Sequence, residues 1–193
     1  MTTAAPAFDF AVAADRMAAL VAGIGDDQLA ARTPCPDVSV AALLGHVAGL
    51  TEAFRQAATK EVSGSRPPEV AASELPADWR TLIPARLDAL VDAWREPDAW
   101  AGETEAGGVT APAPAMAAVA LDELVIHGWD LARATGLPFD ITPDELEVLE
   151  GFLAEVPDEG TPGLFGPVQP VAPGASRLDR VLARTGRRAD WTA

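Results

Sequence analysis

The two histidines of the chain, His46 and His127, are the residues with the clearest capacity for chemistry. His127 ends the segment Glu123-Leu-Val-Ile-His127, so on a helix a carboxylate one turn before it shares its face. Imidazole nitrogens and carboxylate oxygens are common ligands of divalent metals. If His46 reaches the same point from a second helix, the three side chains form a three-ligand metal site.

Glu123, His127 and Asp130 lie on one face of the predicted helix. At about 100° per residue they fall within an arc of roughly 60° that otherwise holds small or apolar residues. Asp122 and Arg133 fall on the arc that is predicted to face solvent. A carboxylate that points into a core is costly unless it is paired or bound to a cation. The position of Glu123 therefore indicates a bound cation.

His46 is also predicted to face the core. Its neighbours three and four residues away are Ala42, Leu43, Leu50 and Ala53. A single histidine on an apolar face is more often a hydrogen-bonded core residue than a ligand. Two such histidines, together with a carboxylate four residues from one of them, favour a metal site between facing helices of a bundle.

The predicted ligand set of His46, Glu123 and His127 suits zinc, with iron, nickel and manganese as alternatives. Three protein ligands leave one coordination position open, as in catalytic rather than structural zinc sites. One carboxylate against a dication leaves a local charge of about +1, so a bound water or thiol ionises more readily. Asp130 is predicted either to hold a ligand imidazole from outside the ligand set or to pair with an arginine. No further catalytic residue is predicted.

Cys35 and the tryptophans are weaker candidates for a functional role. Cys35 lies between two prolines just before a predicted helix, whose N-terminus would lower the pKa of the thiol. A packed and inert cysteine is the favoured interpretation. Trp79, Trp94 and Trp100 are interpreted as core residues rather than as the lining of a pocket. Trp129 is interpreted as a packing anchor.

Helical periodicity dominates the sequence and predicts an all-α fold. Ser39 is expected to cap the second helix, Gly136 to end the fourth, and Thr142 to open the fifth through a capping box. Four long helices with apolar stripes predict a four-helix bundle with a long crossover loop and short C-terminal helices. The predicted helices cover residues 8–31, 40–59, 81–96 and 114–136, with two more that begin near 142 and 176; the predicted loops are 61–80, 101–113 and 157–174.

The chain is expected to consist of two parts with different charge. Residues 1–156 would form the metal-binding bundle with its fifth helix, and residues 157–193 a Pro/Gly-rich loop and a basic C-terminal helix packed on the bundle. Residues 111–170 contain eleven acidic side chains and one basic side chain, whereas residues 171–193 contain five arginines and two aspartates. This difference predicts that the basic end packs on the acidic body, and a solvated basic tail is the alternative.

Composition narrows the classes of function. A formal charge of −15 argues against nucleic acid as a partner. No apolar run approaches the roughly 18 residues of a membrane span, and the N-terminal residues lack the basic start of a signal peptide. A single cysteine excludes an internal disulfide and fits a reducing compartment, so a cytoplasmic protein is expected. A monomer and a homodimer are both open.

Three segments together resemble a known family. Thr33-Pro-Cys-Pro36 precedes Leu43-Leu-Gly-His46, and Glu123-Leu-Val-Ile-His127 continues as Gly-Trp-Asp-Leu-Ala132. With the ending from Phe165 to Trp191, they resemble the DinB-like metal-binding bundles. The resemblance is to the actinobacterial branch that is related to the metal-binding domain of mycothiol-dependent maleylpyruvate isomerase.

The resemblance implies a four-helix bundle that holds a divalent metal, typically zinc, through His46, Glu123 and His127. It also implies mycothiol as a cosubstrate and a small electrophile as its partner. The chain has no room for the extra C-terminal domain of the isomerase, so the substrate of that enzyme is not carried over. Val38 replaces the aromatic residue that the family often has before the Ser39 position.

The predicted function is thus that of a thiol-dependent S-transferase or isomerase in which the metal activates the thiol. Three alternatives stay open at this point. They are a metal-dependent hydrolase, a non-enzymatic metal-binding or interaction module, and a metal-free protein in which the histidines and the glutamate form a structural network.

Overall fold

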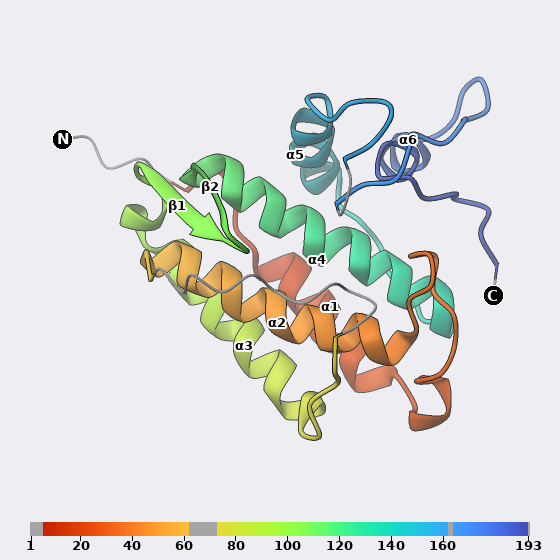
Figure 1. The fold of residues 1–193 in the computed structure, drawn as a ribbon, viewed down its shortest axis with the longest axis horizontal. Coiled ribbons are helices and arrows are strands. Elements are labelled where there is room, and N and C mark those ends of the chain that lie inside the picture. The colour runs from red at the N-terminus through yellow and green to blue at the C-terminus, as the bar shows by residue number, and fades with distance from the viewer. Residues whose placement is uncertain (1–5, 62–72, 162–163, 193) are drawn as a thin grey trace.

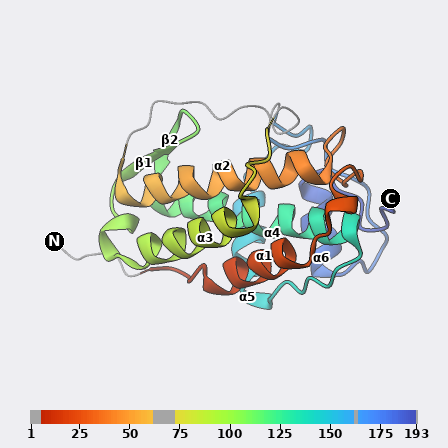
Figure 2. The ribbon, with the colours of Figure 1, turned by 90° about the horizontal axis from the view of Figure 1, so that it is seen from below.

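Four long helices form a bundle in the computed structural model, which describes residues 6–61, 73–161 and 164–192 (Figures 1 and 2). In both views α2 and α3 run in one direction, and α1 and α4 run in the opposite direction. Each of α1 and α2 packs against both α3 and α4. The predicted all-α bundle is confirmed. Its helices are α1 (Ala11–Gly23), α2 (Val40–Thr59), α3 (Trp79–Arg95) and α4 (Ala113–Thr135).

Local sequence signals set the ends of the two helices that carry the candidate ligands. The Ser39 side chain accepts a hydrogen bond from the backbone N–H of Ala42 and so caps α2. Gly136 ends α4 in the left-handed conformation, with φ of +73°, which glycine adopts without strain. Both helix boundaries agree with the prediction to within a residue or two.

The core of the bundle is apolar, and the predicted stripe of the first helix lies in it. Trp94 and Trp100 are buried at the end of the bundle where α3 ends and α4 begins. Trp79 and Trp129 are buried as well, so the interpretation of the tryptophans as packing residues is confirmed. The buried stripe residues are Phe10, Ala14, Met17, Leu20, Val21 and Ile24.

The predicted first helix is too long. α1 ends at Gly23, Ile24 turns into extended backbone, and a 3₁₀ helix (η1) follows at Asp26–Gln28. Glycine loses more backbone freedom than any other residue when it enters a helix. A helix is therefore less stable at Gly23 and Gly25. The apolar periodicity continues past the true end of the helix because Ile24 still packs in the core.

The predicted loop over residues 101–113 contains a β-hairpin, and the prediction of a plain loop is wrong. β1 (Glu103–Ala106) pairs antiparallel with β2 (Val109–Pro112) after the 3₁₀ helix η3 (Pro97–Trp100). Gly107 and Gly108 both have positive φ, at 60° and 77°, and two such residues suit a tight hairpin turn. The hairpin packs on α2 and α4.

Two close backbone contacts hold the segments beside the candidate ligands. A Cβ atom added to Gly45 would lie 2.6 Å from the carbonyl oxygen of Glu74, so the chain before α3 lies directly on α2. A Cβ atom added to Gly128 would lie 2.3 Å from the Phe139 ring. Most of the predicted crossover, residues 62–72, lies outside the described residues.

Two shorter helices follow the bundle. α5 (Pro143–Leu153) opens with the predicted capping box of Thr142 and Glu145 and packs on α4. α6 (Arg177–Arg184) packs on α5 and lies apart from the four bundle helices in Figure 1. The division of the chain near residue 156 stays a prediction.

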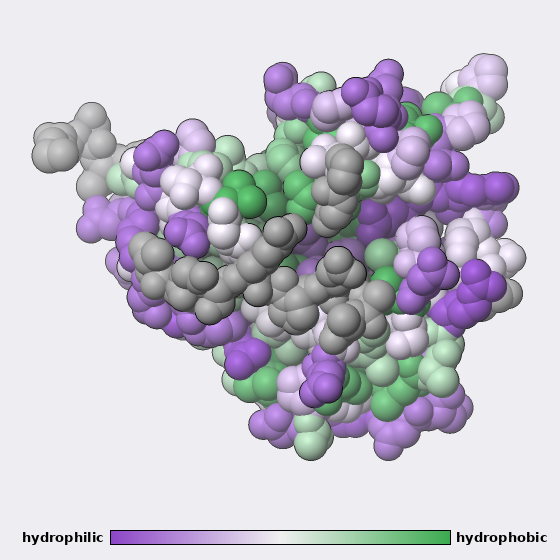
Figure 3. Space-filling model, in the orientation of Figure 1, coloured by the Kyte–Doolittle hydropathy of each residue, from purple (hydrophilic) through white to green (hydrophobic). Residues whose placement is uncertain are grey.

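The surface is mixed rather than uniformly polar. On the face in Figure 3, hydrophobic side chains gather between the hairpin and α5, and hydrophilic ones cover much of the rest. Within the described parts of the chain, no helix is both long enough and apolar enough to cross a membrane.

Candidate metal centre

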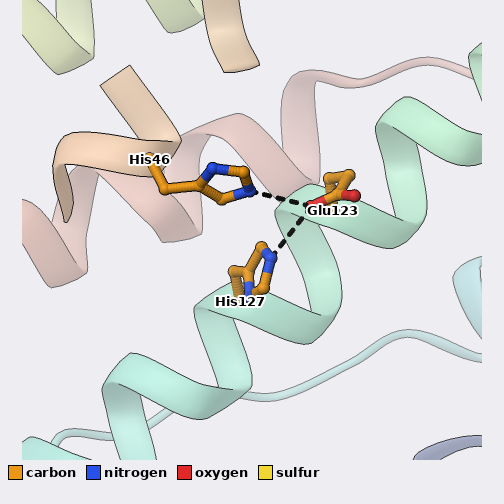
Figure 4. Close-up of side chains that lie close together, drawn as sticks. All are labelled: His46, Glu123 and His127. Carbon is orange, nitrogen blue, oxygen red and sulfur yellow. Dashed lines mark ion pairs between the residues drawn. The ribbon is translucent and has the colours of Figure 1, made fainter. Parts of the chain in front are cut away.

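His46, Glu123 and His127 meet between α2 and α4 (Figure 4). Nε2 of His127 lies 2.9 Å from Oε2 of Glu123, and Nε2 of His46 lies 3.7 Å from the same oxygen. The two imidazole rings are nearly perpendicular, with centroids 5.2 Å apart. One donor atom from each residue lies within 4.8 Å of the other two. The helices therefore bring together the three side chains that the sequence singled out.

The surroundings of the Glu123 carboxylate test whether these residues fit a cation. Oε2 is buried, and among the described residues its nearest partners are Nε2 of His127 at 2.9 Å and Nε2 of His46 at 3.7 Å, neither of which forms a well-aligned hydrogen bond with it. A buried carboxylate is costly unless a positive charge compensates it, and either a protonated imidazole or a metal ion supplies that charge. Two nitrogens and one oxygen are a donor set that zinc and other transition metals accept. The residues present fit a divalent cation.

The charges of the three side chains are strongly coupled. Burial acts to lower the pKa of His127, but the charges of Glu123 and Asp130 and the contacts with both raise it to about 9. Burial acts to raise the pKa of Glu123, but the charge of His127 and the contacts with both imidazoles hold it well below its ordinary value. Without metal, His127 is thus an imidazolium at neutral pH, and a cation must displace its proton.

Asp130 makes both of the contacts that the sequence left as alternatives. Its Oδ2 lies 3.2 Å from Nδ1 of His127 and accepts a hydrogen bond of 2.9 Å from Nη2 of Arg187. Asp130 is completely buried, and Arg187 is 8% exposed. Sequence reasoning counted Arg187 only among the basic residues near the C-terminus, because nothing in the local pattern relates it to α4, 57 residues away.

Asp122 is not on a solvent-facing arc, and that prediction is wrong. Its side chain is 3% exposed, and its Oδ1 has no hydrogen-bond partner among the residues that the structure describes. Burial and the neighbouring charge of Glu123 raise its pKa to about 8, so the group is a neutral carboxylic acid at neutral pH. The charge of Arg187 acts on Asp122, so the chain after α6 lies near this part of α4. Arg133, on the same predicted arc, is exposed.

Cys35 is partly buried close to this cluster. Burial raises the pKa of its thiol to about 11, the charge of Arg187 acts to lower it, and the charges of Asp130 and Glu123 act to raise it. The expectation of a lowered pKa at the helix N-terminus is therefore wrong. The thiol stays protonated near neutral pH, which agrees with the favoured interpretation of a packed, inert cysteine.

Known proteins resemble the chain both in sequence and in fold. A sequence model of the mycothiol maleylpyruvate isomerase N-terminal domain matches residues 10–132, the range that contains all three candidate ligands. Uncharacterized proteins from two strains of Mycobacterium tuberculosis are 30% identical over 196 residues, which cover 91% of this chain and 95% of theirs.

Two solved structures share the fold. The crystal structure of the mycothiol-dependent maleylpyruvate isomerase matches with a TM-score of 0.58 at 22% identity, and a histidine-to-alanine variant of it matches with 0.57 at 20%. The match covers 74% of this chain and 65% of the isomerase, so the chain spans about two thirds of that enzyme's length. The DinB-like resemblance is thereby confirmed, and the chain belongs to the family of the mycothiol maleylpyruvate isomerase N-terminal domain.

Proposed function

We propose that the protein binds a divalent metal through His46, Glu123 and His127 and uses it in a thiol-dependent transfer or isomerisation. The observation that carries the proposal is the convergence of one donor atom from each residue within 4.8 Å of the other two, with Oε2 of Glu123 facing both imidazole nitrogens. When bound, zinc, nickel, iron or manganese would supply a Lewis acid that lowers the pKa of a thiol. The thiolate is the stronger nucleophile toward an electrophilic carbon.

The residues around the ligands favour an anionic partner such as a thiolate. Glu123 is the one carboxylate in the proposed ligand set. The carboxylate of Asp130, which contacts His127, is neutralised by Arg187. Asp122 adds no charge at neutral pH because burial raises its pKa to about 8. A dication held here keeps a local charge of about +1, which a thiolate neutralises.

The related isomerase is mycothiol-dependent, and this supports mycothiol as the thiol. The chain spans 65% of that enzyme's length, so the substrate of the isomerase is not part of the proposal. The partners proposed here are a low-molecular-weight thiol and a small electrophile.

The test begins with the metal. Protein purified without chelator is analysed for zinc, nickel, iron and manganese, and wild type is compared with His46→Ala. Bound metal in near-equal ratio to wild-type protein, and its loss in the variant, support the proposal. Wild-type protein that binds none of the four metals, even when each is added in excess, overturns it.

The second step is turnover with mycothiol and a model electrophile. Wild type loaded with zinc is compared with His127→Ala and with Arg95→Gln, a surface variant that breaks exposed ion pairs with Asp9 and Asp92. We expect activity in wild type and Arg95→Gln and none in His127→Ala. Equal rates in all three contradict thiol activation, and turnover of esters or amides without thiol would indicate the hydrolase instead.

A further inference from the structure

Arg187 joins the C-terminal segment, defined here as residues 177–192, to the candidate metal centre. Its Nη2 donates to Oδ2 of Asp130 at 2.9 Å and its Nε to Oδ1 at 3.4 Å, so the guanidinium grips both carboxylate oxygens. Its Nη1 donates to the carbonyl oxygen of Thr185 at 2.9 Å. Each nitrogen of the buried guanidinium therefore has a partner, and the planar fork has one orientation.

The turn after α6 directs Arg187 toward α4. Gly186 has φ of +82°, and the Arg187 N–H donates to the carbonyl oxygen of Leu182. A Cβ atom at position 186 would lie 2.9 Å from Cα of Gly166, so the turn is packed against the preceding loop. Glycine is required here both for its backbone conformation and for this close contact.

α6 itself is fixed to α5, which keeps the turn in place. Arg177 forms a two-bond ion pair with Glu150, and Nη2 of Arg184 donates to the carbonyl oxygen of Leu153 at 2.8 Å. The segment thus reaches the centre from a rigid base rather than as a free tail. Figure 1 shows α6 beside α5, on the outer side of α4.

Asp130 passes the effect of Arg187 to a candidate ligand. One oxygen, Oδ2, contacts both Nη2 of Arg187 and Nδ1 of His127. An imidazole that donates through Nδ1 carries its lone pair on Nε2, which is the atom that faces Glu123. Without Arg187, the buried carboxylate would have His127 as its remaining charged partner and would lose its fixed orientation.

We infer that Arg187 is a positioning residue of the metal centre, acting through Asp130 on the orientation and tautomer of His127. The inference rests on the metal centre proposed above. On this inference, the C-terminal segment helps to position the proposed ligands, although all three of them lie in α2 and α4. By linkage, metal binding and docking of this segment strengthen each other.

The first experiment measures metal affinity in Arg187→Gln by competition with a chromophoric chelator, using zinc alone. We expect affinity about 10–100-fold weaker than in wild type, the usual effect of losing a residue that supports a ligand. Arg188→Gln is the matched control, because it removes the same charge one residue later from an exposed ion pair with Asp190. It should bind zinc as wild type does.

The second readout reports ligand geometry directly. In the cobalt-substituted protein, Arg187→Gln should shift the visible ligand-field bands, and Arg188→Gln should not. Arg187→Lys keeps the charge but loses the fork, so its zinc affinity should lie between those of wild type and Arg187→Gln. Arg187→Lys also tests the inference if Arg187→Gln does not fold.

A double-mutant cycle separates positioning from general stability. If Arg187 acts through Asp130, adding Arg187→Gln to Asp130→Asn should weaken zinc binding less than twofold further. Unchanged zinc affinity and cobalt spectrum in the folded Arg187 variants, or fully additive losses in the cycle, overturn the inference while the metal centre stands. Failure of wild type to bind zinc or cobalt instead rejects the metal centre itself.

Discussion

Two regions of the bundle differ in how well their buried polar atoms are hydrogen-bonded. At the end near the hairpin, Nε1 of Trp94 donates to the carbonyl oxygen of Phe54, and Nε1 of Trp100 donates to that of Trp94. At the candidate metal centre, Oε2 of Glu123 and Oδ1 of Asp122 are buried without a well-aligned hydrogen bond from the described part of the chain, although Oε2 forms an ion pair with His127. Folded proteins satisfy nearly all buried polar groups, and exceptions concentrate at functional sites. The first region is satisfied internally, whereas the second has the unsatisfied polar atoms that the proposed metal site would explain.

The largest effect on stability is expected in the region near the hairpin, where the buried indole N–H groups are hydrogen-bonded. Trp94→Ala removes a side chain that is 1% exposed and should lower the free energy of unfolding by about 3–5 kcal/mol. Urea unfolding of the metal-free protein measures this. The zinc affinity of the folded variant should equal that of wild type. A large loss of zinc affinity would show that the region around Trp94 and the candidate metal centre are not independent.

His127→Ala is expected to have the converse effect. Zinc affinity should fall by more than about 100-fold, since the loss of a supporting residue alone costs about 10–100-fold. The metal-free variant should remain folded, as judged by circular dichroism. Zinc binding within tenfold of wild type would remove His127 from the ligand set.

The pH dependence of zinc binding tests the difference between the two regions, because His127 at the candidate metal centre binds a proton when no metal is present. Burial acts to lower the pKa of His127, but Glu123 and Asp130 raise it to about 9, so zinc must displace a proton below that pH. Zinc affinity should rise about tenfold per pH unit from about 6.5 to 9 and level off above, with one proton released. Calorimetry in buffers of different ionisation enthalpy counts that proton, and a flat profile would contradict the prediction.

The same shift has a consequence for the metal-free protein. In the folded protein the pKa of His127 lies above the ordinary value of 6.5. The contacts of His127 with Glu123 and Asp130 therefore stabilise the fold, and this contribution is complete below pH 6.5. This contribution is lost as pH rises through 9. Thermal unfolding of wild type against His127→Ala over this range should show the difference narrowing.

The last effect concerns Asp122, the second buried carboxyl group beside the candidate ligands. Burial raises the pKa of Asp122 to about 8 from 3.8, so the folded protein holds a proton that the unfolded chain has lost, and stability falls as pH rises from 4 to 8. Asp122→Asn removes the titrating group, so it should flatten this decline and be more stable than wild type at pH 8. Parallel urea-unfolding profiles for the two proteins between pH 5 and pH 8 would show that Asp122 is not the titrating group.

Where the fold depends on local signals, the sequence was sufficient to predict it. Ser39 and Gly136 determine the ends of α2 and α4 through their own backbone and side-chain chemistry, and the apolar spacing around His46 and His127 orients both residues. The hairpin was missed because its strands have four residues each, too short for a clear alternation.

The surroundings of the candidate site could not be predicted, because they depend on contacts between distant segments. Asp122 is buried and feels the charge of Arg187, and Arg187 reaches Asp130 across 57 residues of sequence. A helical wheel places residues around one axis and contains no information about later segments that cover it. The convergence of the three candidate ligands and the contacts of Asp130 were therefore predictable, whereas the burial of Asp122 and the place of Arg187 were not.

The glycines beside the candidate ligands bear on any attempt to transplant this centre into another scaffold. Gly45 precedes His46 and Gly128 follows His127, and any larger residue would collide with the Glu74 carbonyl or the Phe139 ring. Grafting three ligands alone onto a designed bundle would leave both helices without these close neighbours. A transplanted site must therefore include Gly45 and Gly128, and the segments that pack on them, as well as the three candidate ligands.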